Sequence, residues 1–206
     1  MEKTLLEQLA QYSTPELCDG MEVFRTMDPG IRGMAAVRKI IGPALTVNVP
    51  VGEGGFIPEA ILAAKPGDII VIAGGGNVKS SYWGDMRSQC AMLAGVIGVV
   101  VDGAFRDIEG CEEIGLPIYA RTVTPGTALK ANKGQLNVPI SCGGVTVNPG
   151  DIIVADCNGV CVLRPDEVED VLKRTARKVA AQAYTMEKMR KTGQILPRVI
   201  FPDDEK

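Results

Sequence analysis

The sequence contains no histidine among its 206 residues. This absence excludes a Ser-His-Asp triad, a Cys-His pair, a helical His-Glu zinc site and any imidazole acid or base. Any chemistry of this chain must therefore use carboxylates, arginine, lysine, cysteine, backbone amides or a metal.

Long apolar runs and basic runs are also missing. No apolar stretch approaches the ~20 residues that a membrane span needs, and the N-terminus lacks the apolar core of a signal peptide. The net charge is -3 and the pI is about 5.2, and no run of five or more basic residues occurs. These features disfavour nucleic acid and anionic membranes as partners. We expect a soluble, cytoplasmic protein that acts on a small molecule.

Two further kinds of motif are absent. The six cysteines form no C-x-x-C pair, and several lie inside apolar runs as small hydrophobic residues do, so we expect reduced, buried thiols rather than disulfides. Neither G-x-x-x-x-G-K-[ST] nor G-x-G-x-x-G occurs, which disfavours a nucleotide loop at Gly74-Gly-Gly-Asn77. We interpret that segment as a mobile stretch that lets a substrate approach the backbone.

Length and composition favour a single domain over residues 1–206, because a chain that is 46% apolar can bury a sizeable core. The pattern predicts helices at 4–12, from 15 toward 28, at 58–64, 85–93 and 108–114, and a long amphipathic C-terminal helix at 165–191. It predicts strands within 37–49, broken at Gly42-Pro43, and at 69–73, 96–101, 116–120, 138–147 and 152–163. Alternating strands and helices indicate an α/β fold, with a partly parallel central sheet flanked by helices.

One hexapeptide, Pro-Gly-Asp-Ile-Ile-Val, occurs at 66–71 and again at 149–154. Both copies are typical of a tight turn that leads into a buried strand. The alternative is that they are two equivalent site loops. We favour two similar turns before two core strands.

Charged residues lie at both ends of the stretch from Asp85 to Asp107. A helix N-terminus carries free amides and partial positive charge, so Gly84-Asp85-Met86-Arg87 can hold a carboxylate or a polarised carbonyl oxygen. The alternative is that Asp85 only caps its helix.

Arg106 and Asp107 follow the predicted strand at 96–101, at the sheet edge where α/β proteins bind ligands. Arginine offers a planar fork that matches a carboxylate, and aspartate is a hard oxygen ligand suited to hydrated Mg²⁺. A 2-oxo acid presents a carboxylate and a ketone oxygen that together can chelate a metal, so its binding site needs both an arginine and a metal ligand. The alternative is an ordinary surface ion pair.

Asp85, twenty intervening residues and Arg106-Asp107 form the pattern D-x20-R-D. Flanking stretches at 42–47, 65–71, 95–107 and 147–156 accompany it. Over roughly residues 14 to 190 the chain resembles the RraA-like family, which includes metal-dependent 4-hydroxy-4-methyl-2-oxoglutarate / 4-carboxy-4-hydroxy-2-oxoadipate (HMG/CHA) aldolases.

This resemblance implies a swivelling β/β/α domain that assembles into trimers or hexamers with sites between subunits. It implies that Asp107 holds Mg²⁺ or Mn²⁺ largely through waters and that Arg106 binds the ketone or carboxylate oxygens. Backbone amides from Gly84 through Asp85, Met86 and Arg87 would hold the pyruvate end. Asp85 would act in catalysis by positioning the arginine, a water or the substrate hydroxyl.

The resemblance further implies a class II pyruvate aldolase with accompanying oxaloacetate decarboxylase activity. The alternatives are a regulator that docks on a ribonuclease or helicase and a Schiff-base enzyme that uses Lys79 or Lys65. The chain departs from its relatives at Gly52-Glu-Gly-Gly55 and at Asp156-Cys-Asn-Gly159. A carboxylate from a neighbouring subunit is also expected, with Asp19, Glu22 and Glu187 as candidates.

Overall fold

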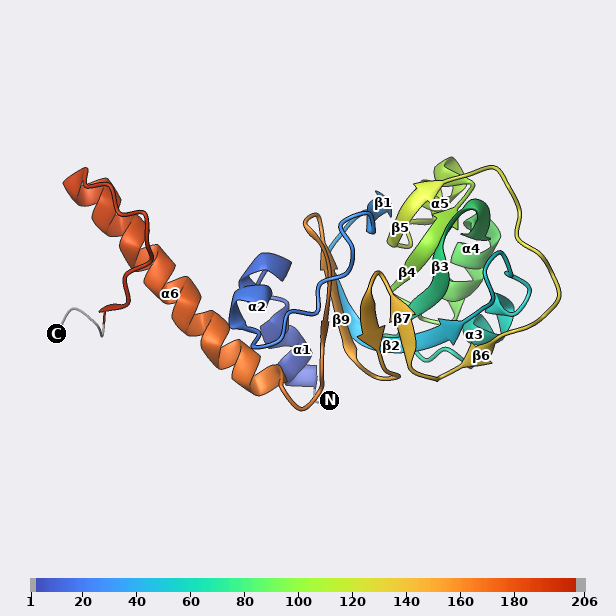
Figure 1. Ribbon diagram of the computed structural model, residues 1–206, viewed down its shortest axis with the longest axis horizontal. Coiled ribbons are helices and arrows are strands. Elements are labelled where there is room, and N and C mark those ends of the chain that lie inside the picture. The colour runs from blue at the N-terminus through green and yellow to red at the C-terminus, as the bar shows by residue number, and fades with distance from the viewer. Residues whose placement is uncertain (1–2, 203–206) are drawn as a thin grey trace. The chain divides into compact units, whose positions relative to one another are not determined.

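The protein is described by a computed structural model that covers residues 3–202 (Figure 1). Within this range the chain forms two compact units. The helical unit comprises residues 3–24 and 166–202, and the sheet unit comprises residues 25–165. Each is described by itself.

The sheet unit is organised around one sheet of eight strands in the order β1-β5-β4-β3-β2-β9-β10, with β6 paired to β2. Its strands are β1 (Arg32–Ala35), β2 (Ile40–Asn48), β3 (Ile69–Trp83), β4 (Gly98–Phe105), β5 (Ile118–Val123), β6 (Gln135–Leu136), β9 (Ile152–Asp156) and β10 (Gly159–Leu163). The central strands β2, β3, β4 and β5 are parallel neighbours, whereas β1, β6, β9 and β10 pair antiparallel. The sheet is therefore mostly parallel.

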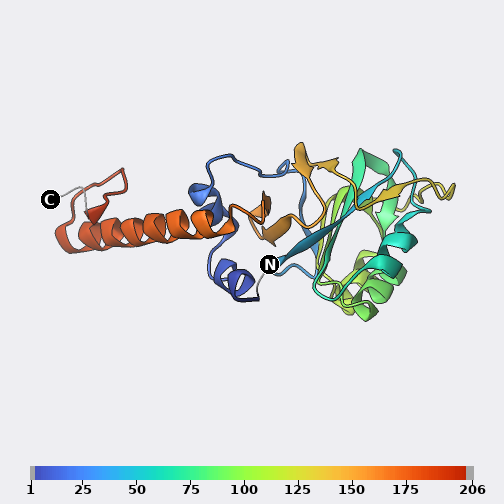
Figure 2. The same ribbon diagram turned by 90° about the horizontal axis from the view of Figure 1, so that it is seen from below.

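Both faces of the sheet are covered, as the side chains of β4 demonstrate. Val99 and Val101 pack in the apolar cluster that contains residues of α3 (Ile57–Ala63), α4 (Asp85–Leu93) and α5 (Ile108–Ile114). Val100 points the other way and packs with the hairpin of β7 (Ile140–Cys142) and β8 (Val145–Val147). Successive strand residues face opposite sides, so a wholly apolar strand needs a cover on each. The three layers confirm the predicted α/β class and β/β/α arrangement (Figure 2).

Strand β2 differs from the prediction, because it runs unbroken through Gly42-Pro43. The ladder changes partner at this point: residues 40–43 pair with β9, and residues 44–48 pair with β3. Proline has no N–H to donate and fits where one ladder gives way to another. A Cβ on Gly42 would lie 2.4 Å from the Gly67 carbonyl oxygen, so this glycine permits a close backbone approach rather than a turn.

The predicted mobile segment Gly74–Asn77 is instead part of β3, and the predicted loop from Asp102 to Phe105 is part of β4. The two strands stay paired through register shifts, with Asn77 opposite Gly103. The Tyr82 ring occupies the space where a Cβ of Gly74 or Gly103 would stand, and its hydroxyl donates to the Gly74 carbonyl at 2.9 Å. The glycines thus make room for an aromatic ring, and the loop begins only at Arg106.

Both copies of Pro-Gly-Asp-Ile-Ile-Val form turns before buried strands, as favoured above. The Asp68 carboxylate accepts the Lys65 amide at 2.8 Å, and the Asp151 carboxylate accepts the Asn148 amide at 2.7 Å. The glycines of the two turns have φ of +92° and +81°. The chain then enters β3 in one case and β9 in the other.

The helical unit contains α1 (Lys3–Leu9), α2 (Thr14–Gly20) and α6 (Val168–Thr192). A capping box precedes α2, in which the Glu16 carboxylate accepts the Ser13 amide at 2.7 Å. The prediction that this helix continues toward Asp28 is wrong. It ends at Gly20, whose carbonyl accepts Arg174 Nε of α6 at 2.6 Å, and where a Cβ would meet Thr175 Oγ1 at 2.2 Å.

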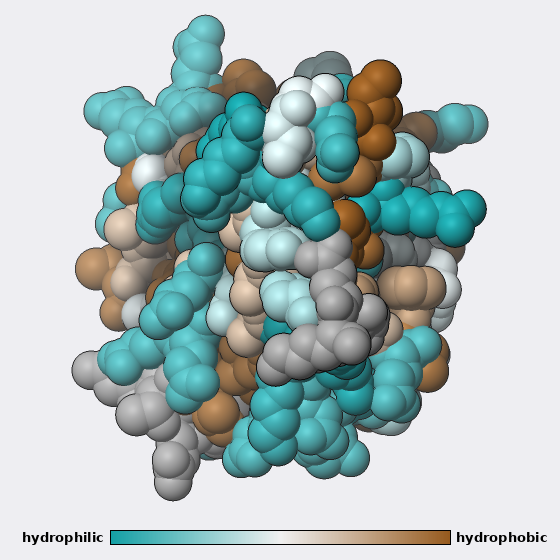
Figure 3. All heavy atoms as spheres, turned by 90° about the vertical axis from the view of Figure 1, so that its left-hand side faces the viewer, coloured by the Kyte–Doolittle hydropathy of each residue, from teal (hydrophilic) through white to brown (hydrophobic). Residues whose placement is uncertain are grey.

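The C-terminal helix confirms the prediction for 165–191 in type and near-complete extent. Hydrophilic side chains are frequent around the C-terminal end of α6, which is nearest the viewer in Figure 3. Between residues 3 and 202, none of the helices combines the length and apolar character needed to cross a membrane.

Candidate functional site

A pocket of about 210 Å³ lies where the loop after β4 meets the start of α4. Its lining residues are Gly54, Ser81, Trp83, Gly84, Asp85, Met86, Arg87, Arg106, Asp107, Thr127, Ala128, Leu129 and Lys130. All of the site residues predicted at 84–87 and 106–107 are therefore brought together. Their chemical roles stay predictions, whereas their common location is a structural fact.

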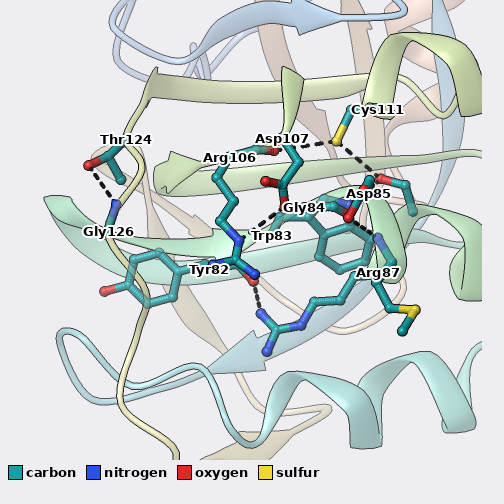
Figure 4. Close-up of polar contacts among 12 residues, drawn as sticks. Tyr82, Trp83, Gly84, Asp85, Arg87, Arg106, Asp107, Cys111, Thr124 and Gly126 are labelled. Atoms are coloured by element: carbon teal, nitrogen blue, oxygen red, sulfur yellow. Dashed lines mark hydrogen bonds and ion pairs between the residues drawn. The ribbon is translucent and has the colours of Figure 1, made fainter. Parts of the chain in front are cut away.

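Arg106 and Asp107 follow directly after β4 and form an ion pair with each other (Figure 4). The Arg106 amide still donates to the Trp83 carbonyl at 3.0 Å, which anchors the loop to the end of β3. Asp107 then adopts the left-handed conformation, with φ of +59°, and precedes α5. Arg106 Nε lies 3.0 Å from Asp107 Oδ2, and the two side chains are 45% and 38% exposed. Both charged groups can thus reach a ligand in the pocket.

Gly84 makes room for this ion pair. It occupies the N-cap position of α4 with φ of -171°, an extended conformation open to any residue. A Cβ here, however, would lie 2.7 Å from Asp107 Oδ2 and 3.4 Å from Arg106 Cγ. The start of α4 and the loop after β4 can approach each other this closely only without a side chain at residue 84.

The first turn of α4 faces the same pocket. The alternative that Asp85 caps this helix is wrong, because Gly84 is the N-cap and Asp85 is the first helical residue. Asp85 Oδ1 accepts the Met86 amide at 2.6 Å, so the carboxylate takes up one of the free helix amides. A ligand anion in the pocket would compete with Asp85 for the Met86 amide.

Arg87 is directed to the backbone. Its guanidinium donates to the Tyr82 carbonyl (Figure 4) and, at 2.6 Å, to the Gly54 carbonyl. Burial, together with the nearby Arg106 charge, lowers the pKa of Arg87 from its ordinary value. This side chain ties the end of β3 to residues 52–55, so any role of Arg87 in substrate binding falls to its backbone amide.

Residues 127–130 form a pocket wall for which the sequence offers no motif. Ser81 donates its amide to the Gly126 carbonyl at 3.0 Å, and the Leu129 amide donates to the Gly52 carbonyl at 2.7 Å. These are pairings between backbone segments far apart in sequence, and no motif encodes them. Lys130 adds a third cationic side chain to the pocket, beside Arg87 and Arg106.

The donors of the pocket suit a hydrated divalent cation. The Asp107 carboxylate is a hard oxygen ligand, and Asp85 is the second carboxylate of the lining. Across residues 3–202, no group of three or more His, Cys, Asp or Glu side chains could hold a metal ion. One or two carboxylates with water in the remaining positions is the arrangement that Mg²⁺ favours. Asp107 therefore fits the expected role of holding such an ion.

Cys111 lies behind this loop and is unsuited to nucleophilic or ligand chemistry. It is buried, and its thiol lies 3.5 Å from the Arg106 carbonyl and 3.7 Å from Ser88 Oγ. Burial, helped by the negative charges of Asp85 and Asp107, raises the pKa of Cys111 to about 11. The thiol is therefore protonated at neutral pH. The six cysteines are free thiols, as predicted, although only three of them are buried.

The other candidate site residues singled out in the sequence are not among those that line the pocket. Lys65 and Lys79, considered for Schiff-base chemistry, are exposed, and the lysine of the pocket is Lys130. A Schiff-base lysine is activated by desolvation in an apolar pocket, which these exposed positions do not supply.

The three candidate carboxylates from a neighbouring subunit belong to the helical unit. Glu22 pairs with Arg174 at 2.9 Å and Glu187 with Lys191 at 2.6 Å, while Asp19 is exposed on α2. A hydrogen bond and the charge of Lys191 hold the pKa of Glu187 below its usual range. All three groups face solvent and are accessible to another molecule.

Several known proteins are similar to this chain over most of its length. A protein of Halalkalibacterium halodurans named "Putative 4-hydroxy-4-methyl-2-oxoglutarate aldolase" is 36% identical over 183 residues, which is 87% of each chain. One of the same name from Azotobacter vinelandii is 31% identical over 153 residues, or 74% of this chain and 94% of its own. Among solved structures, Streptomyces coelicolor RraAS2, described as an unusual member of the RNase ES inhibitor RraA protein family, has a TM-score of 0.81 and 26% identity, covering 92% of this chain and 98% of its own.

The family model RraA-like, described as Aldolase/RraA, matches residues 14–162. That range spans β1 to β9 and so includes the whole pocket. Sequence, fold and pocket agree, and the chain belongs to the RraA-like family.

Proposed function

We propose that this protein is a divalent-metal-dependent class II pyruvate aldolase. It cleaves a 4-hydroxy-2-oxo acid of the HMG/CHA type to pyruvate and a second carbonyl compound, and it also decarboxylates oxaloacetate. The observation that carries the proposal is the convergence of Arg106, Asp107 and the N-terminus of α4 on one pocket. The names of the relatives from Halalkalibacterium and Azotobacter support the same class.

The substrate half next to the carboxylate suits these groups. A 2-oxo acid presents a carboxylate and a ketone oxygen side by side. The exposed Arg106 guanidinium is a planar donor for either oxygen, and the amides at the start of α4 favour an anion. Asp107 would hold Mg²⁺ or Mn²⁺, whose charge, when the ion is bound, stabilises negative charge that develops on the ketone oxygen.

The pocket residues stabilise the negative charge that moves within the substrate during cleavage. A base removes the proton from the C4 hydroxyl, the C3–C4 bond breaks, and its electron pair becomes the pyruvate enolate, which is then protonated at C3. Arg106 stabilises the enolate oxygen, and preorganised charge of this kind is worth several kcal/mol of barrier. Asp85 orients a water or the hydroxyl that loses its proton. Loss of CO₂ from oxaloacetate leaves the same enolate.

The test is pyruvate release from a panel of 4-hydroxy-2-oxo acids and oxaloacetate, with Mg²⁺ and then with EDTA. We expect activity that EDTA removes and Mg²⁺ restores. Arg106→Ala and Asp107→Ala should each lower the rate at least a hundredfold or so, in line with the loss of one charge-stabilising group. Arg32→Ala, which removes an exposed arginine on β1, is the matched control and should keep the full rate. Full activity in either pocket variant, or no pyruvate from any substrate, would falsify the proposal.

The second candidate is a regulator that binds a ribonuclease or helicase without catalysis. It is favoured by the similarity to RraAS2, which is described as belonging to an RNase ES inhibitor family. Such binding would need neither metal nor the pocket carboxylates. Co-purification with such an enzyme that persists in EDTA and in Asp107→Ala, without pyruvate release, would support this candidate instead.

A further inference from the structure

Glu53 is a buried carboxylate next to the pocket, in a chain segment without regular secondary structure. It is only 3% exposed. Its Oε1 accepts the Gly55 amide at 2.5 Å, and its Oε2 accepts the Ala131 amide at 2.9 Å. The two carboxylate oxygens thus join a bend of their own segment to residues 127–131, whose first four members line the pocket.

The ionised form of Glu53 is the one that suits this environment. Burial by itself favours the neutral acid, but hydrogen bonds from the Ala131, Gly55 and Asn132 amides outweigh it. With the added attraction of Lys133, they hold the pKa of Glu53 below its usual range. A charged acceptor for several backbone donors is a strong local restraint on the chain.

Other contacts connect the same two segments to the catalytic side of the pocket. The Leu129 amide donates to the Gly52 carbonyl at 2.7 Å, and the Gly54 amide donates to the Leu129 carbonyl at 2.9 Å. The Gly54 carbonyl in turn accepts the Arg87 guanidinium. Arg87, Gly54 and Leu129 form a continuous series of hydrogen bonds, and Glu53 reinforces it at Ala131.

We infer that Glu53 is a positioning residue, whose buried carboxylate holds residues 127–130 in place as the wall that contacts the substrate beyond C3. The inference rests on the proposed function, in which Arg106, Asp107 and the α4 amides bind the 2-oxo acid half. The wall is then left to contact the C4 substituent. Thr127, Leu129 and Lys130 are the exposed residues of that wall, so Glu53 controls which substituents fit.

One test reads the restraint directly and needs no enzyme activity. Hydrogen–deuterium exchange of the peptide containing residues 127–131 is compared in the wild type, Glu53→Gln and Glu59→Gln. Gln keeps the size of the side chain but loses the charge, so exchange of this peptide should become about tenfold faster. Glu59 is an exposed glutamate in the first turn of nearby α3, and its variant should match the wild type. Equal exchange in all three proteins overturns the inference.

A second test separates this role from catalysis. Glu53→Gln should raise the KM for 4-hydroxy-4-methyl-2-oxoglutarate about tenfold and leave kcat within about twofold. Exchange of pyruvate methyl protons with solvent, which needs only the 2-oxo acid half of the pocket, should be unchanged. A parallel loss of kcat and of proton exchange overturns the positioning role.

The two proposals can fail separately. If the wild type neither cleaves any 4-hydroxy-2-oxo acid nor exchanges pyruvate protons, the proposed function is wrong, while the deuterium exchange still decides whether Glu53 restrains the wall. Should Glu53→Gln fail to fold, Glu53→Asp keeps the charge on a shorter side chain. It is measured in the same way, and wild-type exchange together with wild-type KM would count against the inference.

Discussion

Arg87 and Arg106 line the same pocket but have different surroundings. Arg106 is half-exposed and pairs with a neighbouring carboxylate, so its guanidinium can exchange that partner for a ligand. Arg87 is partly buried and donates to two backbone carbonyls, those of Tyr82 and Gly54. Residue type alone does not separate an arginine that is free to bind a ligand from a structural one. The groups that accept hydrogen bonds from the guanidinium make the distinction.

Adding a single methyl group at Gly84 tests whether the placement of Asp107 matters. Gly84→Ala would place a Cβ 2.7 Å from Asp107 Oδ2, and the carboxylate must then move. Because displacement of a catalytic group by about 1 Å can cost up to a hundredfold in rate, we expect kcat/KM for pyruvate release to fall about tenfold to a hundredfold. Steady-state kinetics measure this change.

Gly144→Ala is the control for that substitution. Gly144 has φ of +79°, and no atom lies within 4 Å of the position that its Cβ would take, so alanine there adds backbone strain without crowding. It should cost about 1 kcal/mol of stability or somewhat more and leave the activity unchanged. If Gly84→Ala keeps the full rate, the placement of Asp107 is not needed for the reaction.

The Arg87 side chain, rather than a strand ladder, holds together the end of β3, residues 52–55 and the start of α4. Arg87→Ala would remove a charged donor from the Tyr82 and Gly54 carbonyls in a partly buried site. We expect the free energy of unfolding to fall by about 2–4 kcal/mol, because hydrogen bonds to a charged donor are among the stronger ones. Urea denaturation measures the loss.

Arg106→Ala is the matched comparison for that experiment. Its ion pair with Asp107 is exposed, and such pairs contribute about 0–1 kcal/mol. The two variants should therefore separate: Arg87→Ala loses stability, whereas Arg106→Ala loses activity and keeps its stability. Equal destabilisation by both would contradict the structural role given to Arg87.

The oligomeric state is the remaining expectation. It concerns the three candidate carboxylates of the helical unit, because one of them is expected to complete the site of a neighbouring subunit. The resemblance to the family implies a trimer or hexamer with sites between subunits. We predict that light scattering finds such an oligomer and that one of Asp19→Asn, Glu22→Gln and Glu187→Gln abolishes activity without unfolding the protein. The affected residue would be the carboxylate that a neighbouring subunit supplies.

A mixing experiment tests whether that carboxylate acts across an interface. Asp107→Ala and the inactive carboxylate variant are combined, dissociated and reassembled. If each site takes Asp107 from one subunit and the second carboxylate from the next, about a quarter of the wild-type activity should return, since random pairing completes one interface in four. No recovery would indicate that both groups belong to the same subunit, or that none of the three residues takes part.

Much of this protein follows from local sequence alone. Apolar runs at 69–73 and 96–101 predicted core strands, the helices at 85–93 and 108–114 were predicted to the residue, and the repeated hexapeptide predicted two turns. The absence of histidine limited the chemistry, and Asp85, Arg106 and Asp107, which the family resemblance singled out, line one pocket. These signals depend on residues near one another in the chain, which is why they can be read without a structure.

Only the tertiary structure decided the rest, because it depended on which distant segments meet. Gly74–Asn77 is strand rather than loop because Tyr82 fills the space above the glycines, and β2 continues through Pro43 because its ladder changes partner there. The pocket wall at 127–130, the backbone acceptors of Arg87 and the buried carboxylate of Glu53 arise from contacts across dozens of residues. The sequence by itself limited which side-chain chemistry is available, and packing decided which charged side chains are free to reach a ligand.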